Sequence, residues 1–190
     1  FGPQDLLRLF TREFLEGRDV HEPEDWFCRL YEQFDTGSEV TRAQLHDLSS
    51  YLPDDLLVKA DIASMASSLE LRSPMLSPDV VNLGLSLPTE MKLDRRRGKR
   101  VLRAAFGDLL PAEVFRRPKR GFGVPLSRWL REDLLEEMQQ TLLDKAFLGR
   151  RIVRPEAVVG LINDHIARRG DHAHRLWALM VLARWLARYA

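Results

Sequence analysis

The chain has 190 residues, of which 45% are hydrophobic and 30% are charged, and its formal net charge is +1. This length and composition fit one domain with a buried core, and they exclude a collagen-like, disulfide-rich or wholly disordered chain. The longest strongly apolar stretch, residues 176–182, is too short to cross a bilayer, and no signal-peptide pattern opens the sequence. The single cysteine, Cys28, cannot form an internal disulfide, so we expect a cytoplasmic protein.

The small net charge hides a strongly basic segment. Residues 92–131 carry 13 Lys and Arg against three acidic residues, a net charge of +10, so the remaining residues carry −9. Such a segment is typical of proteins that bind a partner rich in phosphate, which could be a nucleic acid, a membrane surface or a nucleotide. The alternative is a set of solvated helix faces, and charge alone does not decide between these interpretations.

Apolar residues recur at spacings of three and four through most of the chain, which indicates amphipathic helices. Proline stands at the start of several of these segments, where its fixed backbone angle favours the first helical turn. The pattern predicts helices over residues 3–17, 23–36, 41–50, 54–69, 79–87, 98–110, 127–143, 155–169 and 172–189. No run of alternating residues indicates a strand, so the fold class predicted for the chain is mainly α.

The predicted second helix places Trp26, Phe27, Leu30 and Phe34 toward a core, and Cys28 is expected to be a small core residue. Three irregular segments separate the helices. They are residues 71–76, a charged connector at 92–97, and a loop at 116–125 that holds two prolines and two glycines. Loops of this composition between rigid helices often carry binding residues.

Several common site motifs are absent from the sequence. There is no GxxxxGK[ST], GxGxxG or SGGxDS run for phosphate binding, and the five histidines form no HExxH motif. No cysteine pair could join the histidines around an ion, so we predict no metal site within the chain.

Two clusters of polar residues remain. In the first, Asp55 and Lys59 form an i, i+4 pair, and Glu70 follows at the end of the predicted helix with Arg72 beside it. A carboxylate at a helix C-terminus lies at the unfavourable end of the helix dipole and needs a compensating cation, which Arg72 could supply. Either the pair is structural, or it holds a carboxylate at a site that handles an ammonium ion, a metal or a substrate proton.

The second cluster surrounds Lys119. Arginines flank this lysine, and the glycines after it permit close approach of the backbone to a ligand, which suits a molecule that bears phosphate. A basic surface loop is the alternative, and local chemistry leaves the two interpretations about even.

These clusters lie within longer motifs that resemble the glutamine-dependent asparagine synthetase family. The segment YLPDDLLVKADIASMASSLELRSPML at residues 51–76 is similar to the family pattern YLPDDLLVKxDRxSMAxSLExRxPxLD, and RRPKRGFGVPLSRWL at residues 116–130 is a second match. Shorter matches lie between them, and the ending around Trp177 and Trp185 is also similar. The resemblance is dense from about residue 51 onward and thinner before it.

This resemblance implies a fold and an activity. Enzymes of the family join a glutaminase domain to an α/β synthetase domain of the PP-loop, adenine-nucleotide-hydrolase-like class. The resemblance thus implies that residues 1–190 are the helical C-terminal part of such a domain. In these enzymes ATP activates a carboxylate, aspartate in the namesake, as an acyl-adenylate, and ammonia from glutamine then displaces AMP to give asparagine. The pyrophosphate loop, the Mg²⁺ ligands and the glutaminase domain would precede Phe1, so the chain alone is expected to be inactive.

The resemblance also assigns roles to particular residues. Glu70 matches the glutamate that acts near the acyl-adenylate, and Lys119 matches the lysine that stabilises developing phosphate charge. Four further matches have supporting roles in binding substrate or nucleotide, namely Arg72, Arg120, Gly121 and Phe122.

Two departures from the family pattern leave the acceptor open. Ile62 stands where the pattern has arginine, and Ser77 stands where it has aspartate. Relatives with similar motifs make β-lactam rings or amidate polysaccharide and peptide precursors. A non-catalytic helical module that binds nucleic acid is a further alternative, although a small polyphosphate ligand fits the basic segment better. We expect no nucleic-acid or membrane partner, and the sequence leaves a homodimer open.

Overall fold

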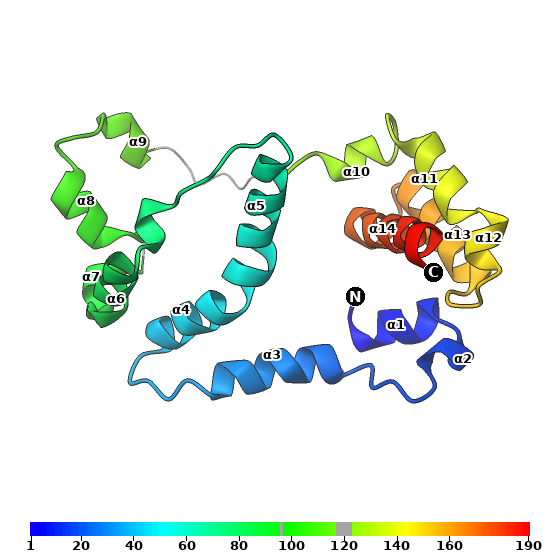
Figure 1. Cartoon of the computed structure of the whole chain (residues 1–190), viewed down its shortest axis with the longest axis horizontal. Coiled ribbons are helices and arrows are strands. Elements are labelled where there is room, and N and C mark those ends of the chain that lie inside the picture. Colours follow the sequence, from blue (N-terminus) through cyan, green and yellow to red (C-terminus); the bar gives the residue numbers. More distant parts are fainter. Residues whose placement is uncertain (96, 117–122) are drawn as a thin grey trace. The chain divides into compact units, whose positions relative to one another are not determined.

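A computed structural model of the chain describes residues 1–95, 97–116 and 123–190. Helices dominate these residues, which contain two isolated β-bridges and no β-strand. The prediction of a mainly α chain is therefore confirmed (Figure 1). The chain divides into two compact units, of which unit 1 comprises Phe1–Pro23 with Arg120–Ala190, and unit 2 comprises Glu24–Lys119.

Unit 1 contains a hydrophobic core built around the last helix. Its helices are α1 (Pro3–Leu9), α2 (Arg12–Leu15), α10 (Leu126–Trp129), α11 (Leu135–Leu142), α12 (Lys145–Leu148), α13 (Pro155–Ile166) and α14 (Ala173–Tyr189). Helix α14 contacts α10, α11, α12 and α13, and α1 contacts α13. The side chains of Leu130, Met138, Leu142 and Leu176 are fully buried among them. This packing gives unit 1 the apolar burial that stabilises a folded domain.

Two predicted helices of unit 1 are interrupted. The first ends at Leu9 because Phe10 adopts an extended backbone and forms an isolated antiparallel bridge with Val153. Helix α2 then starts anew, with the Thr11 hydroxyl accepting the Phe14 backbone N–H at 3.1 Å. The segment between α10 and α11 is a turn in which the Leu134 N–H bonds to the Trp129 carbonyl at 2.7 Å. The apolar spacing along the sequence correctly identifies the buried faces of these helices, but it does not show where the helices are interrupted.

Unit 2 is a succession of shorter helical segments. They are α3 (Glu22–Glu32, which begins just before the unit), α4 (Glu39–Ser49), the π-helical η1 (Leu52–Leu57), α5 (Val58–Met65), the 3-10 turn η2 (Pro74–Leu76), α6 (Pro78–Ser86), α7 (Thr89–Lys92), α8 (Arg100–Phe106) and α9 (Ala112–Arg116). The pattern did not predict η2, α7, α9 or α12, because segments of three to five residues are too short to show a helical period.

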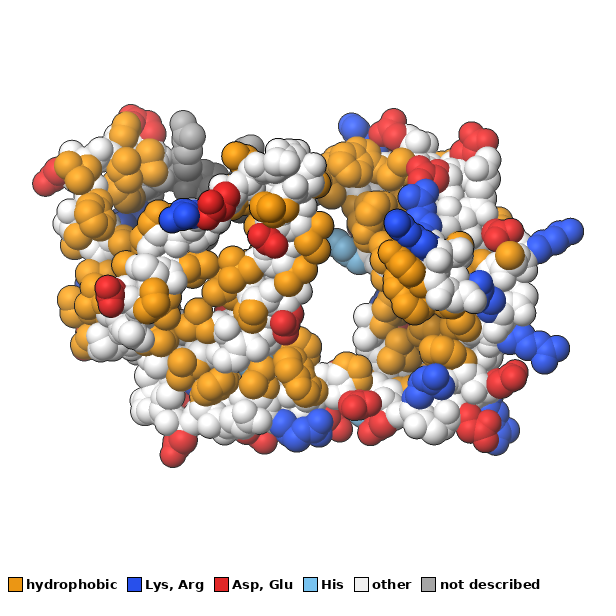
Figure 2. Space-filling model, in the orientation of Figure 1, with side chains coloured by type: hydrophobic (Ala, Val, Ile, Leu, Met, Phe, Trp, Pro, Cys, Tyr) orange, Lys and Arg blue, Asp and Glu red, His pale blue; other side chains and the backbone are white. Residues whose placement is uncertain are grey.

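The described residues of unit 2 bury no large apolar side chain. Their two buried residues are Ser50 and Lys92, and orange hydrophobic side chains lie on the surface over this unit in Figure 2. Trp26 and Phe27 are 42% and 48% exposed, and Cys28 is exposed as well. The expectation that these residues of α3 face a core within the chain is therefore wrong. An amphipathic pattern identifies an apolar face but does not say what covers it.

None of the helices formed by the described residues is long and apolar enough to span a membrane.

Candidate functional site

The segment that carries Glu70 begins at a specific stop at the end of α5. The N–H of Leu69 bonds to the carbonyl of Ser64 at 3.0 Å, and the N–H of Ser68 bonds to that of Met65 at 2.9 Å. These two bonds, with Ser68 in the left-handed region at φ 54°, define a Schellman motif. Helix α5 therefore ends at Met65 and not at the predicted Leu69, and Glu70 is the first residue beyond the motif.

Glu70 and Arg72 form the ion pair that the sequence predicted. The Arg72 Nε donates to Glu70 Oε1 at 2.9 Å. The Arg72 side chain is 83% exposed and the Glu70 side chain is 69% exposed. Solvent-exposed pairs contribute only about 0–1 kcal/mol to stability. The predicted pair of Asp55 with Lys59 is present too, at 3.8 Å. The Glu70–Arg72 pair therefore adds little to stability.

This arrangement can take part in proton transfer. A carboxylate offers about four lone-pair sites on two oxygens, so Glu70 can accept a substrate N–H while Oε1 stays bonded to Arg72. The backbone before Glu70 is fixed by the Schellman motif, and the backbone after Arg72 is fixed by the turn η2, where the Leu76 N–H bonds to the Ser73 carbonyl at 2.9 Å. The segment from Glu70 to Arg72 thus lies between two hydrogen-bonded turns.

The second predicted cluster lies outside the described residues. This holds for Lys119, Arg120, Gly121 and Phe122, so their roles stay predictions. Helix α9, which precedes them in the chain, is hydrogen-bonded to α8. Arg103 of α8 donates to the Phe115 carbonyl of α9 at 3.1 Å and to the Gly98 carbonyl at 3.2 Å, and its guanidinium lies 5.2 Å from the Phe115 ring centroid.

Sequence reasoning did not single out Lys92, which it placed in a charged connector at residues 92–97. The side chain is only 8% exposed, and its Nζ donates to Gln44 Oε1 at 2.9 Å and to Thr41 Oγ1 and the Leu85 carbonyl at 3.0 Å each. The sequence does distinguish Lys92 from the arginines of the connector. Lys92 lies between the apolar residues Met91 and Leu93, whereas these arginines have charged neighbours.

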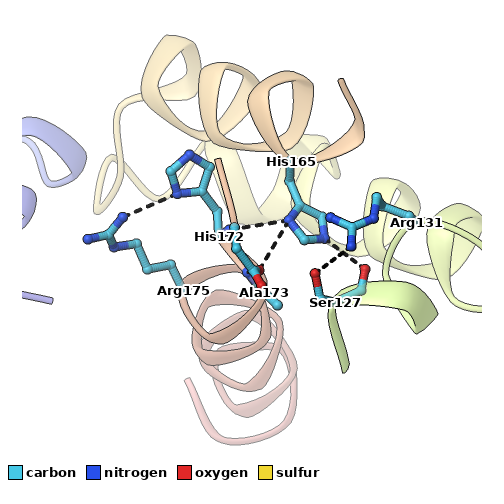
Figure 3. A network of polar contacts seen from close by, with 7 residues as sticks. Ser127, Arg131, His165, His172, Ala173 and Arg175 are labelled. Carbon is cyan, nitrogen blue, oxygen red and sulfur yellow. Dashed lines mark hydrogen bonds and ion pairs between the residues drawn. The ribbon is translucent and has the colours of Figure 1, made fainter. Parts of the chain in front are cut away.

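Unit 1 contains a buried polar network that the sequence did not indicate. Figure 3 shows His165 of α13 between two backbone groups, with its Nε2 3.2 Å from the Ser127 carbonyl and its Nδ1 accepting the His172 N–H at 3.2 Å. Burial lowers the pKa of His165, and the neighbouring Arg131 guanidinium acts in the same direction. A hydrogen bond from the Ala173 N–H lowers the pKa of Asp171, whose Oδ1 lies 3.7 Å from Nδ1.

Metal binding finds no support in the described residues. No group of three or more His, Cys, Asp or Glu side chains there could hold an ion. The part of the chain that the structure describes therefore offers no cluster that fits Mg²⁺.

The helical architecture agrees with the fold class that the sequence motifs predicted. A model of the asparagine synthase family matches residues 3–187. The chain therefore belongs to the asparagine synthase family.

Named relatives agree with this membership. The chain is 39% identical over 148 residues to proteins of Mycobacterium bovis and Mycobacterium tuberculosis that bear the provisional name of glutamine-hydrolyzing asparagine synthetase. It is 30% identical over 148 residues to the glutamine-hydrolyzing asparagine synthetase 1 of Bacillus subtilis. These alignments cover 78% of the chain but only 22–23% of each relative, so the chain spans about a fifth of the length of the relatives it matches. No solved structure matches the chain.

Proposed function

We propose that the chain forms part of the synthetase site of a longer, glutamine-dependent asparagine synthetase. The observation that carries this proposal is the family match over residues 3–187, together with the placement of the Glu70–Arg72 pair within the matching motif. On this proposal, residues 1–190 are the helical C-terminal part of the domain. The PP-loop half and the glutaminase domain belong to the remainder of the longer polypeptide.

The proposed reaction has two steps. In the first, a carboxylate oxygen of aspartate attacks the α-phosphorus of ATP, and pyrophosphate leaves with the electrons of the broken P–O bond. In the second, ammonia released from glutamine attacks the acyl carbon, and AMP leaves. The protein must neutralise the leaving pyrophosphate, hold the acyl group and keep the nitrogen unprotonated when it attacks.

The proposed roles of the residues follow from these requirements. Glu70 orients the ammonia and takes the proton that it loses on attack, while Arg72 holds the Glu70 carboxylate through its 2.9 Å hydrogen bond. Lys119 stabilises the charge that develops on phosphate, and Arg120, Gly121 and Phe122 support nucleotide binding. No step is assigned to Mg²⁺, because the described residues do not fit it and its ligands are expected upstream.

The test uses the full-length polypeptide that contains this chain. Glu70→Gln is expected to lower asparagine and AMP formation by about 10²–10⁴-fold, the range typical of lost acid–base catalysis. Lys119→Ala is expected to lower both by about 10²–10³-fold, the range typical of a lost donor to a developing charge, and glutamine hydrolysis should continue in both variants. Exposed residues of unit 1 provide the controls Glu132→Gln and Lys145→Ala, which are expected to keep full synthesis. Retained synthesis in Glu70→Gln or Lys119→Ala would contradict the assigned role of that residue.

The acceptor is tested separately. The names of the relatives favour aspartate, whereas Ile62 and Ser77 depart from the family pattern. Product analysis with a panel of carboxylates should give asparagine as the main amide. Amidation of a sugar-polymer or peptide precursor would reassign the acceptor and keep the proposed chemistry, whereas closure of a β-lactam ring would replace ammonia by an amine of the substrate itself.

A further inference from the structure

Lys92 is a buried cation whose three donors are all used. Lysine is almost never fully buried unless it is paired, and its ammonium has three N–H donors and no acceptor. Here the three donors meet Thr41 Oγ1, Gln44 Oε1 and the Leu85 carbonyl at 2.9–3.0 Å. We call this set of four residues the Lys92 clamp.

The clamp joins three helices of unit 2. Thr41 and Gln44 lie in the first two turns of α4, Leu85 lies in the last turn of α6, and Lys92 ends α7. The last carbonyls of a helix have no partner within it, so the Lys92 ammonium both satisfies the Leu85 carbonyl and places a positive charge at the favourable end of α6.

Helix α7 is itself fixed against α4. The hydroxyls of Ser38 and Thr89 lie 2.8 Å apart, and Ser38 is the N-cap of α4, where its side chain accepts the Thr41 N–H at 3.3 Å. Thr89 begins α7 and Lys92 ends it, so both ends of this four-residue helix are hydrogen-bonded to the start of α4. The hydrogen bonds at its two ends therefore hold the backbone of α7 in place, and this helps to fix the position of the Lys92 ammonium.

The chain between the clamped helices contains Glu70 and Arg72. Helix α4 continues through Ser50, whose hydroxyl donates to the His46 carbonyl at 2.7 Å and whose carbonyl accepts the Asp54 N–H at 2.9 Å, into η1 and α5. On the other side, η2 contacts α6. Holding α4 and α6 together closes the loop formed by residues 45–84, which lowers the conformational entropy of everything within it.

We propose that Lys92 is a positioning residue for Glu70, because its clamp holds together α4 and α6, the two helices between which the segment that carries the Glu70 carboxylate lies in the chain. This inference rests on the proposed function in that the consequence for activity requires Glu70 to act in amide formation. The ordering of the segment by Lys92 does not require it. A catalytic group displaced by about 1 Å can cost about 10²-fold in rate, so a clamp outside the reacting groups can still control turnover.

The test compares variants of the full-length polypeptide. Lys92→Met removes the donors at nearly constant length, Lys92→Arg keeps the charge and donors, and Thr41→Val with Gln44→Leu removes the side-chain acceptors without changing the lysine. Lys145→Met, at an exposed lysine of unit 1, is the matched control. Circular dichroism checks that each variant is folded, and if Lys92→Met is not folded, the acceptor-side variant replaces it.

The first readout is amide hydrogen exchange, which does not depend on activity. Lys92→Met is expected to speed exchange at the hydrogen-bonded amides of Leu69 and Leu76 by about tenfold or more, since these amides bracket Glu70. Lys92→Arg should restore most of the protection, and Lys145→Met should leave it unchanged. Unchanged exchange in folded Lys92→Met, or in the acceptor-side variant that replaces it, would overturn the clamp.

The second readout is kcat for asparagine formation. Lys92→Met is expected to lower it by about 10–100-fold, and Lys92→Arg should recover part of this loss. If both residues act through Glu70, the combined loss in Lys92→Met with Arg72→Ala will be smaller than the product of the single losses, whereas multiplying losses would overturn the positioning role. Unchanged kcat with faster exchange would also overturn it. A wild-type protein that makes no asparagine would refute the proposed function. Hydrogen exchange would still test whether the Lys92 clamp orders the segment that carries Glu70.

Discussion

The backbone N–H of His172 donates to Nδ1 of His165 at 3.2 Å, so the buried imidazole uses that nitrogen as an acceptor. Its other nitrogen, Nε2, must then carry the proton and donate to the Ser127 carbonyl at 3.2 Å. Neutral His165 satisfies both groups and joins α13 to the start of α10 and to the residue before α14. A second proton on Nδ1 would face the His172 N–H and break this arrangement.

Acid should therefore destabilise unit 1 through His165. Burial holds the folded-state pKa of His165 below its ordinary value, so the unfolded chain takes up the proton first as pH falls. The stability contributed by neutral His165 is complete above the unfolded pKa of about 6.5 and is lost as pH falls toward the lower folded pKa. Thermal melts at pH values from about 7.5 to 5.5 should show a steeper loss in the wild type than in His165→Gln.

The groups that face His165 set the controls for this measurement. Burial is the largest cause of the lowered pKa of His165, Arg131 and His172 act in the same direction, and Asp171 opposes them. His174→Gln, at an exposed histidine of α14, should keep the wild-type pH dependence. An equal pH slope in the wild type and in His165→Gln would contradict this account.

Ser68 occupies a backbone conformation that suits glycine. Its φ of 54° at the end of α5 costs a residue with a Cβ about 1–2 kcal/mol relative to the right-handed region. Ser68→Gly should therefore raise the free energy of unfolding, and Ser68→Val should lower it, as measured by urea denaturation. Ser67, whose φ is not positive, provides the control, because Ser67→Gly should give no gain. A loss in Ser68→Gly similar to that in Ser67→Gly would count against the strain.

The sequence predicted most of the helices because their buried faces repeat at helical spacing, as in α13 and α14. It did not predict the end of α5, since the Schellman motif there uses a serine where glycine is the usual marker. The Glu70–Arg72 pair followed from proximity along the chain, whereas the helix-dipole argument for it was wrong because α5 ends five residues before Glu70. Lys92 and His165 did not, because their partners lie 7–51 and 7–38 residues away in sequence and only the fold brings them together.

Two adjacent leucines at the end of α11 should respond very differently to truncation. Leu142 is fully buried in the core of unit 1, whereas Leu143 is 40% exposed. Leu142→Ala leaves a cavity among packed side chains and is expected to cost about 2–5 kcal/mol. Leu143→Ala is expected to cost less than about 1 kcal/mol because solvent can occupy much of the space. Urea denaturation of the two variants measures both values, and equal costs would contradict the described core.

Arg72 should matter more for activity than for stability. Its pair with Glu70 is largely exposed, so Arg72→Ala should change the free energy of unfolding by less than about 1 kcal/mol. On the proposed mechanism the same change frees the Glu70 carboxylate and lowers kcat for asparagine formation. Arg169→Ala, which breaks the exposed 2.8 Å pair with Asp164, is the matched control and should lower neither quantity appreciably. Arg72→Ala with unchanged kcat would show that Glu70 needs no such partner, and a similar kcat loss in both variants would point to a general effect of lost surface charge.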